Sequence, residues 1–252
     1  MTDVKSTLMT HLIAYYPGRE TSLAAAKAMI DGGASYLEVQ FPFSDPSADG
    51  PVIQKACSDA LEAGFSLEGG FGLIREIKEY SEDVPVFLMS YGNVPFVYGI
   101  DAFAERCKKE GISGLIIPDL ILGRDEGMYE AGMKHGVPVM PVIVPTISEQ
   151  RLHEFINLGP EFIYVAMRTG ITGRETLISE SLLAFLDAFG NTGIKVLAGF
   201  GVRKREQVKA LEPHVHGIIV GSALVAEISD NVDGGDKAVY NAVKNRVSGL
   251  TG

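Results

Sequence analysis

Two acidic residues stand close together in the chain, one in an apolar segment and one in the turn that follows it. Glu38 lies in an apolar run, and Asp49 follows a turn rich in proline, serine and aspartate, directly before Gly50-Pro51, which opens a helix. A strand and its following loop can direct two carboxylates into one cavity while giving them different environments. One can then carry a proton while the other stays ionised. The pair predicts acid–base chemistry.

Glycines in the C-terminal third form a second group with chemical meaning. They occur in residues 169–173 and 199–201, and in Gly221-Ser222, which starts a short helix. Glycine lets backbone N–H groups approach an anion closely, and a helix N-terminus adds a favourable dipole. Eight-stranded α/β barrels often bind phosphate with the loops after strands 7 and 8 and a short extra helix. These loops therefore predict a phosphate site that needs no lysine or arginine.

Short β-rich segments alternate with amphipathic helical segments along the chain. This alternation predicts βα units and a parallel sheet. Eight units indicate an α/β protein with one (β/α)8 TIM-barrel domain over residues 1–252 and extra short helices. A doubly wound sheet is the alternative, but it has fewer strands and a glycine-rich loop after the first one. The predicted strands cover residues 11–16, 35–41, 85–89, 114–119, 138–144, 162–167, 195–198 and 217–220.

In such a barrel the active site lies at the C-terminal ends of the strands. We expect the polar residues at these ends to face one mouth, and they are Glu38, Asp49, Tyr91, Asn93, Asp119 and Tyr164. His11 lies within the first predicted strand, where we expect a packed core histidine. No lysine ends a predicted strand, so a Schiff-base aldolase is not expected. His214 and His216 precede the last strand, on the opposite face, and we expect no metal site.

Net charge and cysteine content limit the classes of binding partner and the compartment that we expect for this protein. The net charge of -10 argues against binding to nucleic acid or to an anionic membrane surface. Cys57 and Cys107 have no metal-ligand spacing, and two cysteines in a chain of 252 residues suggest a reducing compartment. The N-terminus has no signal pattern, and no segment approaches the roughly 20 apolar residues of a membrane span. We expect a cytoplasmic protein.

Residues 38–54 closely resemble the signature of the tryptophan synthase α chain family. Shorter motifs follow in the family's order at residues 91–93, 118–120, 169–173, 199–201 and 220–222. The resemblance covers roughly residues 8–228. It implies a (β/α)8 lyase that cleaves indole-3-glycerol phosphate to indole and D-glyceraldehyde 3-phosphate in tryptophan biosynthesis. It also implies an α2β2 heterotetramer with allosteric coupling, in which pyridoxal phosphate belongs to the β chain and this chain needs no cofactor.

The resemblance assigns roles to individual residues. Glu38 matches the family's proton carrier, Asp49 the carboxylate that bonds the indole ring N–H, and Tyr164 a supporting tyrosine. Thr172 matches the family's mobile loop and Phe200 an apolar wall, while Asn93 and Asp119 are expected to meet the β chain. The complete expected substrate and phosphate set is Tyr91, Thr172, Gly173, Phe200, Gly201, Gly221 and Ser222.

Three segments depart from the family's pattern. The first strand usually reads proline-phenylalanine-isoleucine-threonine-alanine-glycine-aspartate-proline, whereas this chain has Thr10-His-Leu-Ile-Ala-Tyr-Tyr-Pro17. Gln40 stands where a glycine is usual, and Leu120-Ile-Leu-Gly-Arg124 replaces a proline with paired acids. Two alternatives to the lyase therefore stay open. One is a barrel that acts mainly as an allosteric partner of a β chain, and the other is a different phosphate-binding barrel, such as a sugar-phosphate isomerase.

Overall fold

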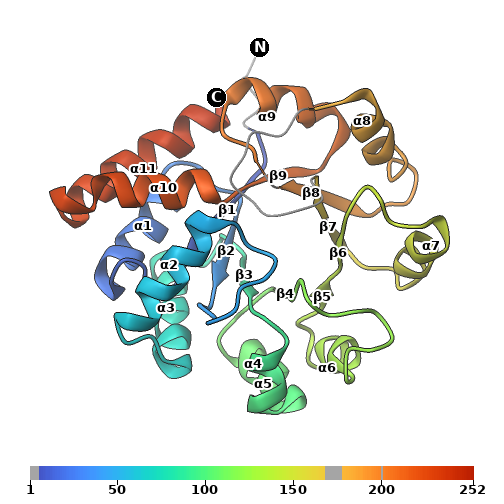
Figure 1. The fold of residues 1–252 in the computed structure, drawn as a ribbon, viewed down its shortest axis with the longest axis horizontal. Coiled ribbons are helices and arrows are strands. Elements are labelled where there is room, and N and C mark those ends of the chain that lie inside the picture. The colour runs from blue at the N-terminus through green and yellow to red at the C-terminus, as the bar shows by residue number, and fades with distance from the viewer. Residues whose placement is uncertain (1–5, 168–177, 200) are drawn as a thin grey trace.

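The strands of the computed structural model form one parallel sheet that curls into a barrel (Figure 1). The structure describes residues 6–167, 178–199 and 201–252. Neighbouring strands follow the order β5-β4-β3-β2-β1-β9-β8-β7-β6, and every pairing is parallel. The described strands are β1 (Leu8–Ile13), β2 (Tyr36–Gln40), β3 (Val86–Met89), β4 (Gly114–Ile116), β5 (Val139–Met140), β6 (Val142–Ile143), β7 (Phe162–Ala166), β8 (Lys195–Gly199) and β9 (Gly217–Val220).

The fifth predicted strand is divided into β5 and β6 by Pro141. β5 pairs with β4 and β6 pairs with β7, so the two halves bring the ends of the sheet together. Proline has no N–H to donate to a ladder and interrupts a central strand. Its carbonyl still accepts the N–H of Tyr164 at 2.9 Å. The expected (β/α)8 barrel is confirmed, with one strand in two pieces.

Helices surround the strands on the outside of the barrel (Figure 1). The described helices are α1 (Arg19–Asp31), α2 (Pro51–Glu62), α3 (Leu67–Tyr80), α4 (Asn93–Tyr98), α5 (Ile100–Lys109), α6 (Met128–His135), α7 (Glu149–Asn157), α8 (Glu180–Asp187), α9 (Arg205–Leu211), η1 (Glu212–His214), α10 (Ser222–Asn231), η2 (Val232–Gly234) and α11 (Asp236–Thr251).

Alternation along the strands divides the buried side chains into two sets. Leu37 and Val39 of β2 join the large apolar cluster that also holds residues of the surrounding helices, and Leu12 of β1 does the same. A smaller cluster fills the barrel and includes Met9 and Phe87. Successive residues of a strand point to opposite faces, so Glu38 and Gln40 belong on the inner face. The apolar outer face thus fixes which polar residues face inward.

The predicted bounds of the first strand were wrong. β1 begins at Leu8, three residues before the expected start, and ends at Ile13. Its six residues are all buried, because both faces of this strand are covered. Tyr15 has a φ of 69°, in the left-handed region, which stops the extended segment.

Two glycines of α3 allow a test of how this helix fits the barrel. A Cβ at Gly70 would lie 2.7 Å from ring atoms of both Phe41 and Phe65, whereas one at Gly72 would meet nothing within 4 Å. We expect Gly70→Ala to lower the free energy of unfolding by about 1–3 kcal/mol through overpacking. Gly72→Ala should raise it by up to about 1 kcal/mol through helix propensity. Urea denaturation measures both, and equal shifts would contradict this packing.

Candidate active site

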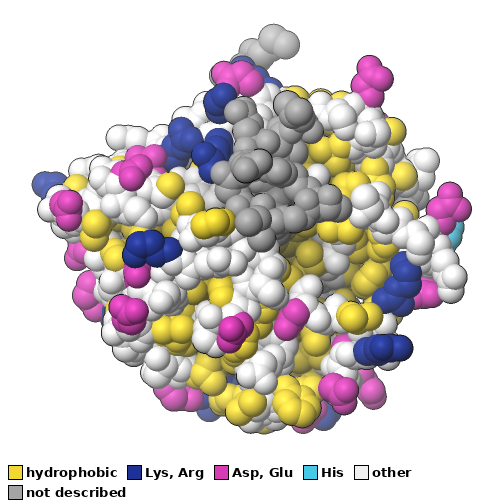
Figure 2. Space-filling model, viewed as in Figure 1, with side chains coloured by type: hydrophobic (Ala, Val, Ile, Leu, Met, Phe, Trp, Pro, Cys, Tyr) yellow, Lys and Arg dark blue, Asp and Glu magenta, His cyan; other side chains and the backbone are white. Residues whose placement is uncertain are grey.

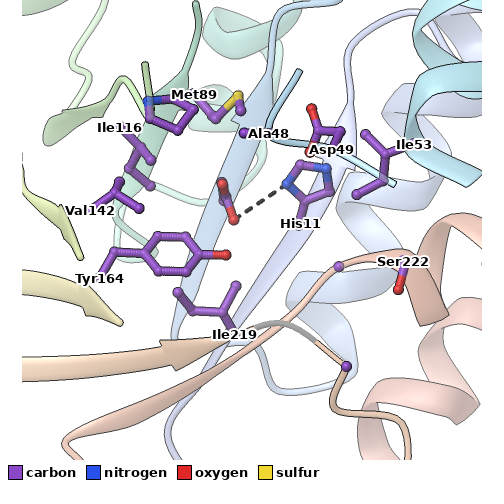
Figure 3. A pocket seen from close by; sticks show the side chains of 14 residues that line it. His11, Ala48, Asp49, Ile53, Met89, Ile116, Val142, Tyr164, Ile219 and Ser222 are labelled. Carbon is purple, nitrogen blue, oxygen red and sulfur yellow. Dashed lines mark ion pairs between the residues drawn. The ribbon is translucent and has the colours of Figure 1, made fainter. Parts of the chain in front are cut away.

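A cavity opens inside the barrel toward the C-terminal ends of the strands (Figure 3). Its walls come from strands and loops far apart in the sequence, as the barrel topology requires. Its apolar lining includes Met89, Ile116 and Ile219. The polar residues that line it are His11, Glu38, Asp49, Tyr164 and Ser222. A mostly apolar cavity with a few convergent polar groups is the usual form of a small-molecule site.

Glu38 lies beside His11 because β1 and β2 pair in a register that places these two residues opposite each other. The His11 Nδ1 is 3.3 Å from the Glu38 Oε2, and both side chains are about 5% exposed or less. Burial lowers the pKa of His11, but the carboxylates of Glu38 and Asp49 raise it by more, so that it lies above its ordinary 6.5. The two carboxylates thus favour the imidazolium form, and their effect outweighs that of burial.

The interpretation of His11 as a packed core histidine was right about its burial but missed its place at the cavity. The side chain is buried, but it lines the cavity and pairs with the carboxylate expected to do chemistry. The available signal was a lone ionisable residue in an otherwise apolar strand. Its neighbour across the sheet depends on strand register, which one sequence does not reveal.

Asp49 accepts hydrogen bonds from two neutral side chains, whereas Glu38 lies beside an ionisable imidazole. Its Oδ2 accepts the Nε2–H of Gln40 and the O–H of Tyr91, each at 2.8 Å. Burial raises the pKa of Asp49 above its ordinary 3.8, although His11 and the two hydrogen bonds lower it in part. The carboxylate therefore sits in a nearly dry site whose donors favour its ionised form. The two acids have the different environments that their spacing led us to expect.

Tyr91 lies behind Asp49 and is 1% exposed, so it supports the carboxylate from the protein side. Its hydroxyl also accepts the N–H of Ala48 at 3.1 Å, and its ring stacks on Phe43 at 5.3 Å between centroids. Gln40, which departs from the family's glycine, is fully buried and reaches the same Asp49 oxygen. Sequence reasoning did not give Gln40 a place in the site.

Tyr164 comes from β7 and enters the cavity wall opposite His11 (Figure 3). Burial raises its pKa well above 10, and the negative charges of Glu38 and Asp49 add to this effect. Its phenol therefore stays neutral at physiological pH. A Cβ at Gly199 would lie 2.9 Å from the Tyr164 hydroxyl, so this glycine makes room for the ring.

Three of the residues expected to bind phosphate line the same cavity. Gly201, Gly221 and Ser222 line it, and α10 begins at Ser222. The first backbone N–H groups of a helix have no partner within it and can bind an anion. Gly201 has a φ of 87°, which favours glycine. Thr172, Gly173 and Phe200, the other residues expected here, lie outside the described residues.

Asn93 and Asp119 do not face this cavity, so the expectation of one common mouth was wrong for them. Both are exposed and line a separate groove that begins beyond the ends of β3 and β4. β4 ends at Ile116, so Asp119 lies three residues beyond the strand, in a loop outside the barrel. Its Oδ1 accepts the N–H of Gly92 at 2.9 Å and so ties the two loops together.

Metal ligands, disulfides and membrane-spanning helices were also sought in the part of the chain that the structure describes. No group of three His, Cys, Asp or Glu residues there could hold a metal ion. Cys57 and Cys107 are buried and do not form a disulfide. No helix of residues 6–167, 178–199 and 201–252 is long and apolar enough to cross a membrane.

Comparisons with known proteins agree with this geometry. The profile of the family described as "Tryptophan synthase alpha chain" matches residues 1–249. The tryptophan synthase alpha chain of Helicobacter hepaticus is 40% identical over 232 residues, which is 90% of this chain and 87% of the relative. That of Methanosarcina mazei is 36% identical over 230 residues, covering 91% and 83%.

Solved structures give the same result. Tryptophan synthase from Mycobacterium tuberculosis superposes with a TM-score of 0.86 at 29% identity, covering 99% of this chain and 94% of the other. A structure described as the basis of mutual activation of the tryptophan synthase α2β2 complex from Pyrococcus furiosus has a TM-score of 0.86 at 29% identity. It covers 98% of both chains.

The donors to Asp49 can be tested directly. We expect Tyr91→Phe to raise the pKa of Asp49 further, because a buried carboxylate then loses one of its hydrogen bonds. A carbon-13 NMR titration of the aspartate carboxyl groups measures this. Tyr36→Phe is the control, because that hydroxyl contacts His216, away from the cavity. An unchanged or lower Asp49 pKa in Tyr91→Phe would refute the assigned contact.

Proposed function

The chain belongs to the tryptophan synthase alpha chain family, and on this basis we propose that Glu38 and Asp49 perform its chemistry, with Tyr164 in support. The reaction is the cleavage of indole-3-glycerol phosphate to indole and D-glyceraldehyde 3-phosphate, which makes the chain a carbon–carbon lyase. Neither a barrel that acts mainly as an allosteric partner of a β chain nor a sugar-phosphate isomerase is favoured. The observation that carries the assignment is that one cavity holds both carboxylates, each with its own partners.

Glu38 is proposed to move the proton in both halves of the reaction. It donates a proton to C3 of the indole ring and then, as a carboxylate, removes the proton of the side-chain hydroxyl. The C–C bond breaks as that hydroxyl becomes the aldehyde, and its electron pair returns to the indole ring. Glu38 ends in the protonation state in which it began, so no other acid or base is consumed.

Asp49 is proposed to stay ionised and to accept the N–H of the indole ring. Protonation at C3 places positive charge on the ring nitrogen, which a buried carboxylate stabilises strongly. Gln40 and Tyr91 hold the carboxylate in place, so it needs little rearrangement as the charge develops. Tyr164, a neutral phenol on the opposite wall, is proposed to pack near the reacting carbon.

The phosphate group of the substrate is proposed to bind at the start of α10. Gly201, Gly221 and Ser222 support this placement because they line the same cavity as the two acids. No lysine or arginine lines the cavity among the described residues, so backbone N–H groups supply the attraction. Thr172, Gly173 and Phe200 complete the proposed set by resemblance to the family.

The β chain is proposed to dock over the groove that holds Asn93 and Asp119. Apolar side chains reach the surface at the lower edge of Figure 2, where Figure 1 has α4 and α5. Phe96, Val97 and Ile121 are 57–77% exposed in this region. An exposed apolar patch with a polar rim suits a protein partner. We further propose an α2β2 assembly in the cytoplasm, pyridoxal phosphate in the β chain alone, and residues 1–252 as one catalytic domain.

Turnover of the variants Glu38→Gln and Asp49→Asn tests the catalytic assignment. We expect each to lower indole release from indole-3-glycerol phosphate by at least about a hundredfold, because each removes an acid–base or charge-stabilising group. Glu105→Gln, on exposed α5, is the control and should keep full activity. Circular dichroism checks that all three fold. Near-complete activity in either cavity variant would mean that its role is wrongly assigned.

The docking surface gives a separate test. We expect Val97→Glu to weaken binding of the β chain at least about tenfold, because a charge must then lose water in an apolar contact. Leu158→Glu, at an exposed apolar residue outside this patch, is the matched control. Titration calorimetry with purified β chain measures both. Indole release by the isolated Val97→Glu chain should stay unchanged, and unaltered β-chain affinity would place the interface elsewhere.

A further inference from the structure

We propose that His11 is a positioning residue that shares one proton with Glu38, so that the proton used in the cleavage belongs to the His11–Glu38 pair. This proposal rests on the proposed role of Glu38. It adds a residue to that role and predicts behaviour that Glu38 alone would not show.

The strand register holds the two groups together. His11 and Glu38 are direct partners in the β1–β2 ladder, so backbone hydrogen bonds of both strands fix their separation. The 3.3 Å between Nδ1 and Oε2 is drawn as the dashed line in Figure 3. The contact is an ion pair without hydrogen-bond geometry, and the Glu38 Oε2 has no hydrogen-bond partner among the described residues. Catalytic hydrogen bonds are often poorly aligned before substrate binds and tighten in the complex.

The second nitrogen of His11 also points to a chemical role. Its Nε2 is buried and has no hydrogen-bond partner among the described residues. A buried polar atom without a partner is costly, so a histidine used only for packing is poorly explained here. An apolar ring would fill the same space, and phenylalanine is the usual residue at this position of the family's strand pattern.

The charges around the imidazole favour a retained proton. Glu38 faces it from β2 and Asp49 from the loop before α2, while Tyr164 of β7 and Ser222 of α10 are neutral. Among the described residues that line the cavity, no cation besides an imidazolium balances the two carboxylates. The pKa of His11 is lowered by burial and raised more by these carboxylates, which agrees with this arrangement.

The proton balance of the reaction closes within the pair. In the resting state the proton lies on His11 and Glu38 is a carboxylate. His11 passes the proton to Glu38, which delivers it to C3 of the indole ring. Glu38 then takes the hydroxyl proton as the C–C bond breaks, and His11 receives it back. No proton is gained or lost overall, and no co-reactant is needed.

The pH dependence of kcat/KM for indole release tests this sharing. The pair keeps its proton until the pH rises through the raised pKa of His11, so the wild type should lose activity only above that value. In His11→Phe the carboxyl group alone must hold the proton, and carboxyl groups ordinarily release it well below an imidazolium. We expect the alkaline limb to move at least about one pH unit lower. His153→Asn, at an exposed histidine, should leave the profile unchanged.

A substrate-free measurement separates this proposal from the proposed function. The chain has five histidines, and the proton NMR signal lost in His11→Phe identifies His11. We expect that signal to titrate above pH 6.5 in the wild type and at least about one unit lower in Glu38→Gln. Equal titration in both proteins, or an unshifted kcat/KM profile in His11→Phe, would overturn the pairing. Full activity in Glu38→Gln would instead overturn the role of Glu38 itself.

Discussion

The register between β1 and β2 is the constraint on which the site depends. Backbone hydrogen bonds set His11 opposite Glu38, and alternation then sends Leu12, Leu37 and Val39 outward to the helices. A slip of one residue would exchange the two faces and turn the acid toward the helices. The apolar packing outside the barrel therefore selects the chemistry inside it. The position of the reactive groups follows from the same forces that fold the chain.

Burying two carboxylates in one cavity is costly, and the structure offsets the cost in two ways. Glu38 lies 3.3 Å from the His11 imidazole, whose protonated form it favours, whereas Asp49 accepts hydrogen bonds from the neutral side chains of Gln40 and Tyr91. A cation can give up its proton, but an amide and a phenol hold a carboxylate without changing its charge. The partner of Glu38 thus suits proton transfer, and the partners of Asp49 suit electrostatic stabilisation by a carboxylate whose charge does not change.

Much of this could be predicted from the sequence, because strand and helix periodicities and glycine loops are local patterns. The alternation of β-rich and helical segments predicted the barrel, and the spacing of Glu38 and Asp49 predicted that both acids face one cavity. The partners of those acids could not be predicted, because His11 and Tyr91 reach them across strand pairings. Asn93 and Asp119 were misplaced because loop paths beyond a strand are not encoded in its period. Pro141 lies within the predicted strand of residues 138–144, but only the strand pairing shows that it divides this strand in two.

The division of the fifth strand at Pro141 leaves one position in the barrel where the strand pairing is interrupted. In a closed barrel, backbone hydrogen bonds join each strand to both of its neighbours. Here β5 bonds to β4 and β6 bonds to β7, and Pro141 between them has no N–H to donate. Local opening begins where the fewest backbone bonds must break. The pairing around the barrel is therefore uneven: β1 and β2 pair over five residues, whereas β5 and β6 each pair with their neighbour over two. The His11–Glu38 contact lies in one of the two most extensively paired parts of the barrel, on two strands that Pro141 does not interrupt.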